Sequence, residues 1–383
     1  MAPGLGDVLA LIRSGQAATR GDILDLTGLS RMTVAQRVDR LLATGLVVES
    51  GTDRATGGRR PRRLVFNDAH AHLAVVTVDT RHTRAAVTDL AGRVLARGSA
   101  DVAVADGPEH TLDRVQQLVR DLLAQSGSTG LAGLAGIGIS VPGPVDPATG
   151  RPSQPPIMPG WDGWPVAEAL GEAFGAPVLV ANDADAEAVG EHAAGGATPA
   201  LCYVKVSTGI GVGIVLDGAV YPGADGGAGD IGHVKLAGHD DAACQCGAHG
   251  CLAAVASGRA VARELRALGH DTASGRDVHA LLERGDADAA EATRAAGRTI
   301  GRVLATVVCL LNPSALVLGG DLASTALLSG VRETVYPLSL PRATRHLDMR
   351  LAALGEDAGL AGLARMLVDR EFSAEAVNRR LGG

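Results

Sequence analysis

Aromatic side chains are scarce in this chain of 383 residues, which has three Phe, three Tyr and two Trp. Apolar residues still make up 46% of it, so it can bury a large core, and that core must consist mainly of Ala, Val and Leu. Lysine is almost missing, because two Lys stand beside 33 Arg. This bias reflects the source genome as much as any physical need, and we infer no function from it.

Long apolar runs are also missing. No run reaches the roughly 18 residues that a membrane-spanning helix requires. The N-terminus has no charged start followed by an apolar stretch, which is the pattern of a secretory signal. We therefore expect a soluble, cytoplasmic protein with no membrane partner.

Charge is distributed unevenly along the chain. The net charge is -7, but residues 1–70 hold ten Arg against seven Asp or Glu, so the remainder carries -10. A basic end on an acidic body is typical of a protein with a nucleic-acid-binding head. An excess of three charges does not by itself exclude chance.

Three helices are expected in the first 45 residues, at 4–13, at 22–26 and at 31–43. A turn at 27–29 separates the second helix from the third, and Ser30 has the right chemistry for the N-cap of the third. A helix, a turn and a capped second helix make the geometry of proteins that bind the DNA major groove.

The polar face of the third helix supplies the expected DNA-contacting residues. Arginine suits guanine and glutamine suits adenine, and the first turns of such a helix reach the base edges. With the N-cap, these residues are Ser30, Arg31, Thr33, Gln36 and Arg37.

A basic, glycine-rich segment at 57–63 lies between two expected strands at 46–49 and 64–66. We interpret this arrangement as a wing whose tip, Gly58, Arg59 and Arg60, contacts phosphates and the minor groove. The alternative is a three-helix domain that binds something other than DNA. The helical pattern alone is weak, and the wing and the local positive charge favour DNA.

Strands and helices alternate from residue 70 onward, which predicts a mixed α/β fold. Three strands at 73–78, 85–90 and 94–99 are joined by short turns and predict an antiparallel meander before a helix at 108–124. The sequence lacks both the Gly-x-x-x-x-Gly-Lys-Ser/Thr loop and the Gly-x-Gly-x-x-Gly fingerprint. Glycine turns follow strands instead, and each could approach a phosphate or simply close a turn; they lie at 142–144, 207–211 and 318–320.

Asn182 and Asp183 directly follow an apolar strand and precede a helix. Ligands bind beyond the carboxyl ends of strands in open sheets, where a carboxylate can act as a general base. The alternative is that the pair only caps the following helix.

Three of the five cysteines lie within eight residues, at Cys244, Cys246 and Cys251. Their spacing favours a metal site over a disulfide framework. With one imidazole they would complete a closed tetrahedral zinc site of the structural kind, and the candidate histidines are His233 and His249. The other two cysteines, Cys202 and Cys309, lie in apolar segments and are expected in the core.

Together these motifs resemble the ROK family of repressors, open reading frames and kinases, over nearly the whole chain. The matching segments are Val141-Pro-Gly-Pro-Val145, Pro159-Gly-Trp161, Asn182-Asp-Ala-Asp-Ala-Glu187 with Gly190-Glu191, Ser207-Thr-Gly-Ile-Gly211, 226–233, the cysteine cluster and 312–320. The winged helix with its Gly-Arg-Arg-Pro tip resembles the repressor branch of the family.

The resemblance implies an N-terminal winged helix followed by a two-lobed, actin-like ATPase and hexokinase-type domain with a sugar in its cleft. The expected segments are a DNA-binding domain at 1–66, a linker at 67–72, a small lobe at 73–180 and a large lobe with the zinc loop at 181–383, whose final helix can return to the small lobe. Asn182 and Asp183 would hold sugar hydroxyls, with Asp183 as the base in a kinase. His233 would bind both zinc and sugar.

Departures from the family pattern argue against catalysis. Family kinases have Asp-x-Gly-Gly-Thr around ATP phosphates, whereas here residues 79–83 are Asp-Thr-Arg-His-Thr, without the two glycines. Asp321 stands where kinases carry a further glycine, and its charge would repel nucleotide. Since phosphoryl transfer depends on positioning, we expect little or no kinase activity.

Two further departures fall in the expected sugar site. Asp230 replaces a Glu and can still reach a hydroxyl through water, but Ala253 replaces a second Glu and cannot form a hydrogen bond. The site should therefore reject the usual sugar of the family and take a different or modified one, or none.

We therefore predict a DNA-binding transcription regulator, by family habit a repressor of carbohydrate genes, that responds to a sugar-type effector. It would act as a homodimer or homotetramer on double-stranded operator DNA. The alternatives are an active sugar kinase with an added DNA-binding domain, and a regulator that senses no small molecule.

Overall fold

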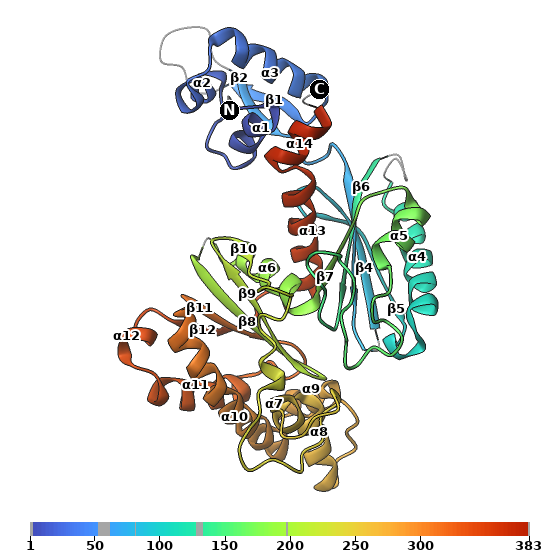
Figure 1. Ribbon diagram of the computed structural model, residues 1–383, viewed down its shortest axis with the longest axis vertical. Coiled ribbons are helices and arrows are strands. Elements are labelled where there is room, and N and C mark those ends of the chain that lie inside the picture. The colour runs from blue at the N-terminus through green and yellow to red at the C-terminus, as the bar shows by residue number, and fades with distance from the viewer. Residues whose placement is uncertain (1–2, 53–61, 81, 128–132, 197, 382–383) are drawn as a thin grey trace.

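The computed structural model describes residues 3–52, 62–80, 82–127, 133–196 and 198–381. A small N-terminal domain stands at one end of the molecule, and two lobes, each built on a five-stranded sheet, follow below it (Figure 1). Within the described residues, no helix is long and apolar enough to cross a membrane.

The N-terminal domain is a three-helix unit with a two-stranded ribbon. Strands β1 and β2 pair antiparallel, and the tip between them, which contains the predicted wing residues Gly58, Arg59 and Arg60, lies outside the described residues. The elements are α1 (Leu5–Arg13), α2 (Arg20–Thr27), α3 (Arg31–Ala43), β1 (Val47–Thr52) and β2 (Arg62–Phe66). The Ser30 hydroxyl accepts a hydrogen bond from the Thr33 N–H at 3.1 Å, so Ser30 is the N-cap of α3.

The first lobe is a sheet with strand order β5-β4-β3-β6-β7. The antiparallel meander is confirmed, because β4 pairs antiparallel with both β3 and β5, whereas β6 and β7 continue the sheet in parallel. Its strands are β3 (His72–Val78), β4 (His82–Asp89), β5 (Val94–Asp101), β6 (Leu134–Val141) and β7 (Val178–Asn182). Helices α4 (Pro108–Gln125) and α5 (Val166–Phe174) pack on one face through an aliphatic core.

The second lobe is a sheet with strand order β10-β9-β8-β11-β12. Its strands are β8 (Ala200–Val206), β9 (Ile210–Leu216), β10 (Ala219–Val220), β11 (Ala315–Gly319) and β12 (Asp348–Leu351). Helix α6 (Asp183–Ala194) packs on one face, and the long helices α10 (Ala287–Leu311) and α11 (Thr325–Leu338) cover the other. Helices α7 (Leu252–Ala256), α8 (Gly258–Ala267) and α9 (Gly275–Glu283) lie between α6 and α10 along the chain, and α12 (Pro341–Thr344) follows α11.

The two C-terminal helices join all three parts of the molecule. Helix α13 (Ala358–Glu371) lies between α6 and the open face of the first sheet, and α14 (Ala374–Leu381) continues from it onto the N-terminal domain (Figure 1). Phe372 at their junction packs edge-on against Phe66, with ring centroids 5.7 Å apart. One apolar core therefore runs from the N-terminal domain into the first lobe.

One prediction about the core is wrong. Cys202 is buried in β8, as expected, but Cys309 is exposed on α10 beside Leu310, which is 80% exposed. The apolar run around Cys309 covers both faces of its helix, and only one of these faces packs against the sheet.

Candidate functional site

A cleft between the two lobes collects most of the predicted site residues. The first lobe contributes loops that follow β3, β6 and β7, including Thr80 and Asn182, and the second lobe contributes the loop after β8 and helices α7 and α8. Asp183, Asp230 and His233 also line it. Most of these segments follow the carboxyl end of a strand. The cysteine-bearing loop and the helices after it, α7 and α8, complete the lining.

Asn182 ends β7 and caps α6. Its Oδ1 accepts hydrogen bonds from the N–H groups of Ala184 and Asp185 at 2.9 and 3.2 Å. Its Nδ2 donates to the Gly143 carbonyl at 2.9 Å, which fixes the turn after β6. The capping interpretation is therefore confirmed, and the same geometry places Asn182 and Asp183 in the cleft wall.

Lys205 is the main site residue that the sequence reasoning missed. Its Nζ lies 2.9 Å from Asp183 Oδ2 and 2.6 Å from Glu187 Oε1. Burial acts to lower the pKa of Lys205, but the carboxylates of Asp183, Glu187 and Asp79 raise it well above its ordinary value. Lys205 is one of only two lysines and interrupts an apolar strand, which was the available signal.

Several carboxyl groups gather around this lysine. Burial, followed by the charges of Asp183 and Asp230, raises the pKa of Asp185 to about 7. Burial also raises the pKa of Asp230 and of Asp321, the latter with help from the charge of Asp79. The carboxyl groups here outnumber the single positive charge of Lys205, so this part of the cleft is acidic.

The two loops that face each other across the cleft touch directly. Thr80 Oγ1 in the β3–β4 loop lies 3.3 Å from Thr208 Oγ1 in the β8–β9 loop. Arg81 and His82 stand in place of the two glycines; Arg81 lies outside the described residues, and His82 begins β4, pairs with Asp101 and is not part of the cleft lining. The contact between the two loops at this point is therefore made by Thr80 and not by His82.

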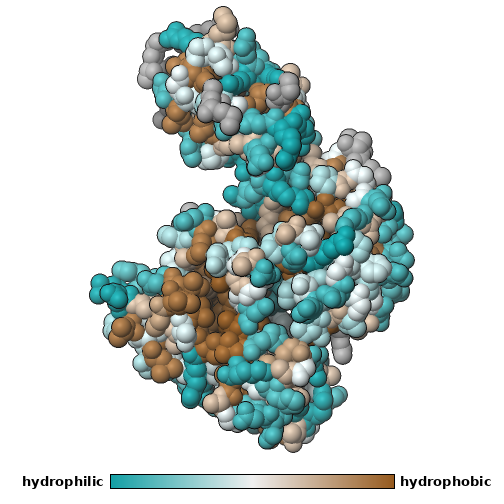
Figure 2. Space-filling view, in the orientation of Figure 1, coloured by the Kyte–Doolittle hydropathy of each residue, from teal (hydrophilic) through white to brown (hydrophobic). Residues whose placement is uncertain are grey.

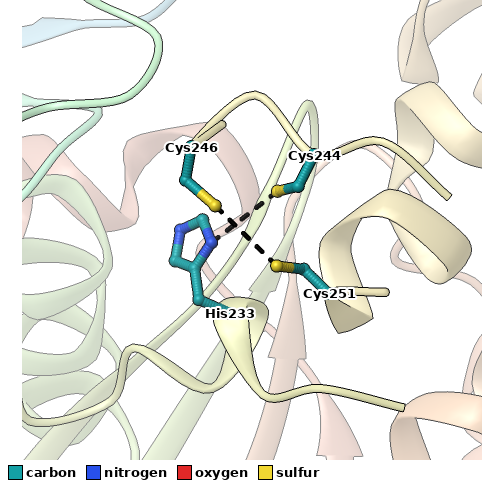
Figure 3. A group of neighbouring side chains, drawn as sticks. All are labelled: His233, Cys244, Cys246 and Cys251. Carbon is teal, nitrogen blue, oxygen red and sulfur yellow. Dashed lines mark hydrogen bonds between the residues drawn. The ribbon is translucent and has the colours of Figure 1, made fainter. Parts of the chain in front are cut away.

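Four side chains of the loop between η3 (Ile231–His233) and α7 converge on one point (Figure 3). Their ligand atoms all lie within 4.8 Å of one another, with Cys246 Sγ 3.8 Å from Cys251 Sγ and His233 Nδ1 3.7 Å from Cys244 Sγ. Zinc–sulfur bonds of about 2.3 Å in a tetrahedron place sulfur atoms about 3.8 Å apart, so this donor set fits zinc. His249, the competing histidine, is not part of the group, and its carbonyl accepts from Lys235 Nζ.

Helix α3, which carries the residues predicted to contact DNA, lies on the outer side of the N-terminal domain, away from the two lobes (Figure 1). Arg31 and Gln36 are exposed, and the hydroxyl of Thr33 is 2.8 Å from that of Ser30. Arg37 differs from these, because it is half-buried, its Nη1 is enclosed without a hydrogen bond among the described residues, and its charge acts on Asp7 of α1. Arg31 and Gln36 are therefore accessible in the first turns of α3 and Thr33 is partly accessible, whereas Arg37 is turned toward α1.

The contact between α14 and α1 is polar as well as apolar. Asn378 Oδ1 accepts from the Gly6 N–H at 2.7 Å, and its Nδ2 donates to Asp7 Oδ2 at 3.1 Å. Arg13 at the end of α1 donates to the Val368 carbonyl and pairs with Asp369 at 2.8 Å. The DNA-binding domain is thus fixed to α13 and α14 at both ends of α1.

Comparison with known proteins places these features in a family. The model of the ROK family matches residues 75–370. The xylose repressor of Bacillus subtilis (strain 168) is 27% identical over 368 residues, which are 94% of this chain and 94% of that protein. A glucokinase of Halalkalibacterium halodurans is 32% identical over 263 residues, which are 64% of this chain and 79% of that protein.

Among solved structures, a ROK family transcriptional regulator, described as a homologue of the Escherichia coli MLC protein, superposes with a TM-score of 0.81. It is 24% identical, and the match covers 98% of this chain and 97% of that one. The expected two-lobed fold of the actin-like ATPase type is therefore confirmed, and α1–α3 with the β1–β2 ribbon form the N-terminal part that the sequence predicts as a winged helix. Because the family model spans most of the chain and the sequence motifs agree with it, the chain belongs to the ROK family.

Proposed function

We propose that this protein is a DNA-binding transcription regulator, a repressor of carbohydrate-related genes, whose cleft binds a sugar-type effector without phosphorylating it. The observation that carries the proposal is the three-helix unit with its β1–β2 ribbon, in which the capped α3 is presented on the outer side of the molecule. Its similarity along 94% of its length to a protein named xylose repressor supports the same function.

The expected contacts with DNA divide into two classes. Arg31, Thr33 and Gln36 would reach base edges in the major groove, and the Ser30 cap holds the start of that helix. Arg59 and Arg60, with Gly58, would contact phosphates and the minor groove. Arg59→Ala with Arg60→Ala should weaken binding to every DNA sequence and reduce the salt dependence, as loss of two phosphate contacts requires.

Zinc is the metal proposed for the cysteine group, held by His233, Cys244, Cys246 and Cys251. Four protein ligands leave no open position, so the metal would stabilise the loop structurally. Three thiolates and a neutral imidazole give the site an excess negative charge, and the Lys235 ammonium, 3.2 Å from Cys251 Sγ, offsets it. Because His233 also lines the cleft, the same metal would fix one wall of the effector site.

Three features of the cleft support a loss of kinase activity. Thr80 meets Thr208 where the loops of a kinase must part around phosphates. Lys205 holds Asp183 in an ion pair, so this carboxylate is a poor base toward a substrate hydroxyl. The buried carboxyl of Asp321 lies near Asp79, and negative charges there oppose the approach of a nucleotide.

Helices α6, α13 and α14 offer a path from the cleft to the DNA-binding domain. Helix α6 begins at Asp183 in the cleft and packs tightly on α13; a Cβ on Gly362 of α13 would lie 1.7 Å from the carbonyl oxygen of Ala186. Helix α13 leads into α14, whose Asn378 is hydrogen-bonded to α1. An effector that favours one lobe arrangement would thus bias the orientation of the winged helix, because a tightly packed helix pair cannot absorb the change.

We also propose that the protein forms a homodimer or homotetramer, since a two-fold assembly reads palindromic operators. Exposed apolar side chains at the carboxyl ends of α10 and α11 are available for such an interface (Figure 2); they are Leu310, Tyr336, Leu338 and Leu340. Light scattering of the purified protein measures the assembly directly.

The experiment that tests the proposed function is a genome-wide chromatin pull-down of the tagged protein, with and without candidate carbon sources. Enrichment at a few palindromic sites that depends on the carbon source supports the regulator. No enrichment under any condition contradicts it.

An active kinase is the second candidate, because Asn182, Asp183 and the 207–211 loop are retained in the cleft. ADP formation with a panel of hexoses decides between the two, and turnover that Asp183→Asn abolishes would establish the kinase. A regulator without a small-molecule effector is the third candidate, and Ala253 favours it. Thermal unfolding across a sugar library tests it, since a ligand that binds only the folded state raises the melting temperature.

A further inference from the structure

The wall of the cleft formed by α7 and α8 is cationic and lacks carboxylates. The side chains that line the cleft from these helices are those of Ala253, Ala254, Arg259, Ala260 and Arg263, together with Ser257 between the helices. Arg259 and Arg263 are four residues apart on α8 and therefore lie on one face of it. The other parts of the lining carry Asp79, Asp183 and Asp230, together with Lys205 and His233.

Both guanidinium groups are available to a ligand. Arg259 has no hydrogen bond or ion pair within the part of the chain that the structure describes, and Arg263 uses only Nη2, which donates to the Ala254 carbonyl at 2.9 Å. The next arginine on the helix differs, since Arg266 donates from both Nε and Nη2 to the Thr272 carbonyl and does not line the cleft. The two cleft arginines therefore face a ligand space without a carboxylate partner of their own.

We propose that the effector is a carbohydrate bearing one anionic group, which Arg259 and Arg263 bind while its hydroxyls face Asn182 and Asp183. This inference rests on the proposed function and specifies its ligand. Guanidinium groups bind carboxylates and phosphates through charge-assisted, often bidentate hydrogen bonds. The carboxylates of Asp79 and Asp183 accept hydrogen bonds from hydroxyls and repel an anion, so they favour a ligand that directs its hydroxyls toward them.

A sugar acid and a sugar phosphate both satisfy this chemistry, and calorimetry and thermal unfolding of the full-length, zinc-loaded protein separate them. The probes are D-glucuronate and D-gluconate for the carboxylate, glucose 1-phosphate and glucose 6-phosphate for the phosphate, and D-glucose and D-xylose as neutral references. We expect at least one anionic probe to bind about tenfold or more tightly than the neutral sugars, because a charge-assisted hydrogen bond contributes that much. Its affinity should fall as NaCl is raised.

Matched variants assign the effect to these residues. Arg259→Gln with Arg263→Gln leaves shorter but still polar side chains and removes both charges, and it should weaken the anionic probe about tenfold or more while changing neutral sugars little. Arg284→Gln is the control, because Arg284 is an exposed arginine outside the cleft with no partner among the described residues. The melting temperatures of the ligand-free variants show whether each one is folded.

Each outcome has a distinct meaning. If neutral sugars bind as tightly as their acids and phosphates, the inference fails and the sugar-responsive regulator stands. If an anion is required but the double variant binds it normally, the assignment to Arg259 and Arg263 is wrong. If no carbohydrate of either kind binds while palindromic DNA is still bound, the effector part of the proposed function fails and this inference fails with it.

Discussion

Replacing Gly6 by alanine should separate the DNA-binding domain from the C-terminal helix. A Cβ at this position would lie 2.0 Å from the Ala374 carbonyl oxygen and 2.8 Å from Ala374 Cα, so α14 must move away from α1. Overpacking of this kind typically destabilises by about 1–3 kcal/mol. The hydrogen bond from the Gly6 N–H to Asn378 would weaken as well. In an isolated helix the same change stabilises by up to about 1 kcal/mol, so a loss of stability would come from the contact with α14.

Gly21→Ala is the matched control. Gly21 lies on exposed α2, where the nearest atom to an added Cβ is Thr19 Oγ1 at the ordinary contact distance of 3.4 Å. Urea unfolding followed by circular dichroism should therefore show lower stability for Gly6→Ala and equal or higher stability for Gly21→Ala.

The second readout is the response of DNA affinity to an effector. Gly6→Ala should retain binding to operator DNA, because α3 is not touched, but the effector should change that affinity much less than in the unmodified protein. A Gly6→Ala protein that is as stable as the unmodified chain, or that responds fully to effector, would refute the path through α14.

Three further predictions concern the other sites. Arg31→Ala or Gln36→Ala should relax the sequence preference by about 1–3 kcal/mol per base pair contacted, measured by competition between operator variants. Cys246→Ser should lower zinc content and the melting temperature, whereas Cys309→Ser at an exposed position should change neither; stoichiometric zinc in the first variant, by atomic absorption, would contradict the ligand set. The raised pKa of Asp185, about 7, means that the folded state binds its proton more tightly than the unfolded state, so stability falls as pH rises from about 4 to 7. Asp185→Asn should flatten this part of the stability profile by a few kcal/mol, and an unchanged profile would show that Asp185 titrates normally.

Local signals made the N-terminal helices predictable. The expected span 31–43 for the third helix agrees with α3, because its cap Ser30 and the turn before it act within one or two turns of chain. The direction of Arg37 was not predictable in the same way. Spacing places it near the DNA-reading face, but α1 packs close enough to enclose its Nη1.

Features that depend on contacts between segments far apart in the sequence could not be predicted from it. Strand β12 was not expected, because its four residues include Asp348 and Arg350, and its identity as a strand comes only from parallel pairing with β11. The docking of α14 depends on Gly6 and Asn378, which are 372 residues apart and have no visible relation in the sequence. The convergence of the three cysteines was predictable because they lie within eight residues of one another, and His233 was identified through the family resemblance.

Lys205 explains how a sugar-kinase cleft can serve a regulator. A sensor must keep its ligand long enough to shift a conformational equilibrium, and catalytic turnover would consume that ligand. In this chain the would-be base Asp183 is retained, together with its place in the cleft wall, but its charge is matched by a buried ammonium 2.9 Å away. Removing the carboxylate would have taken away one of the two ion-pair partners of the Lys205 ammonium and would have loosened the start of α6, from which the path to the DNA-binding domain begins. Retention of Asp183 is therefore compatible with a structural and ligand-binding role, and its presence alone does not indicate a kinase.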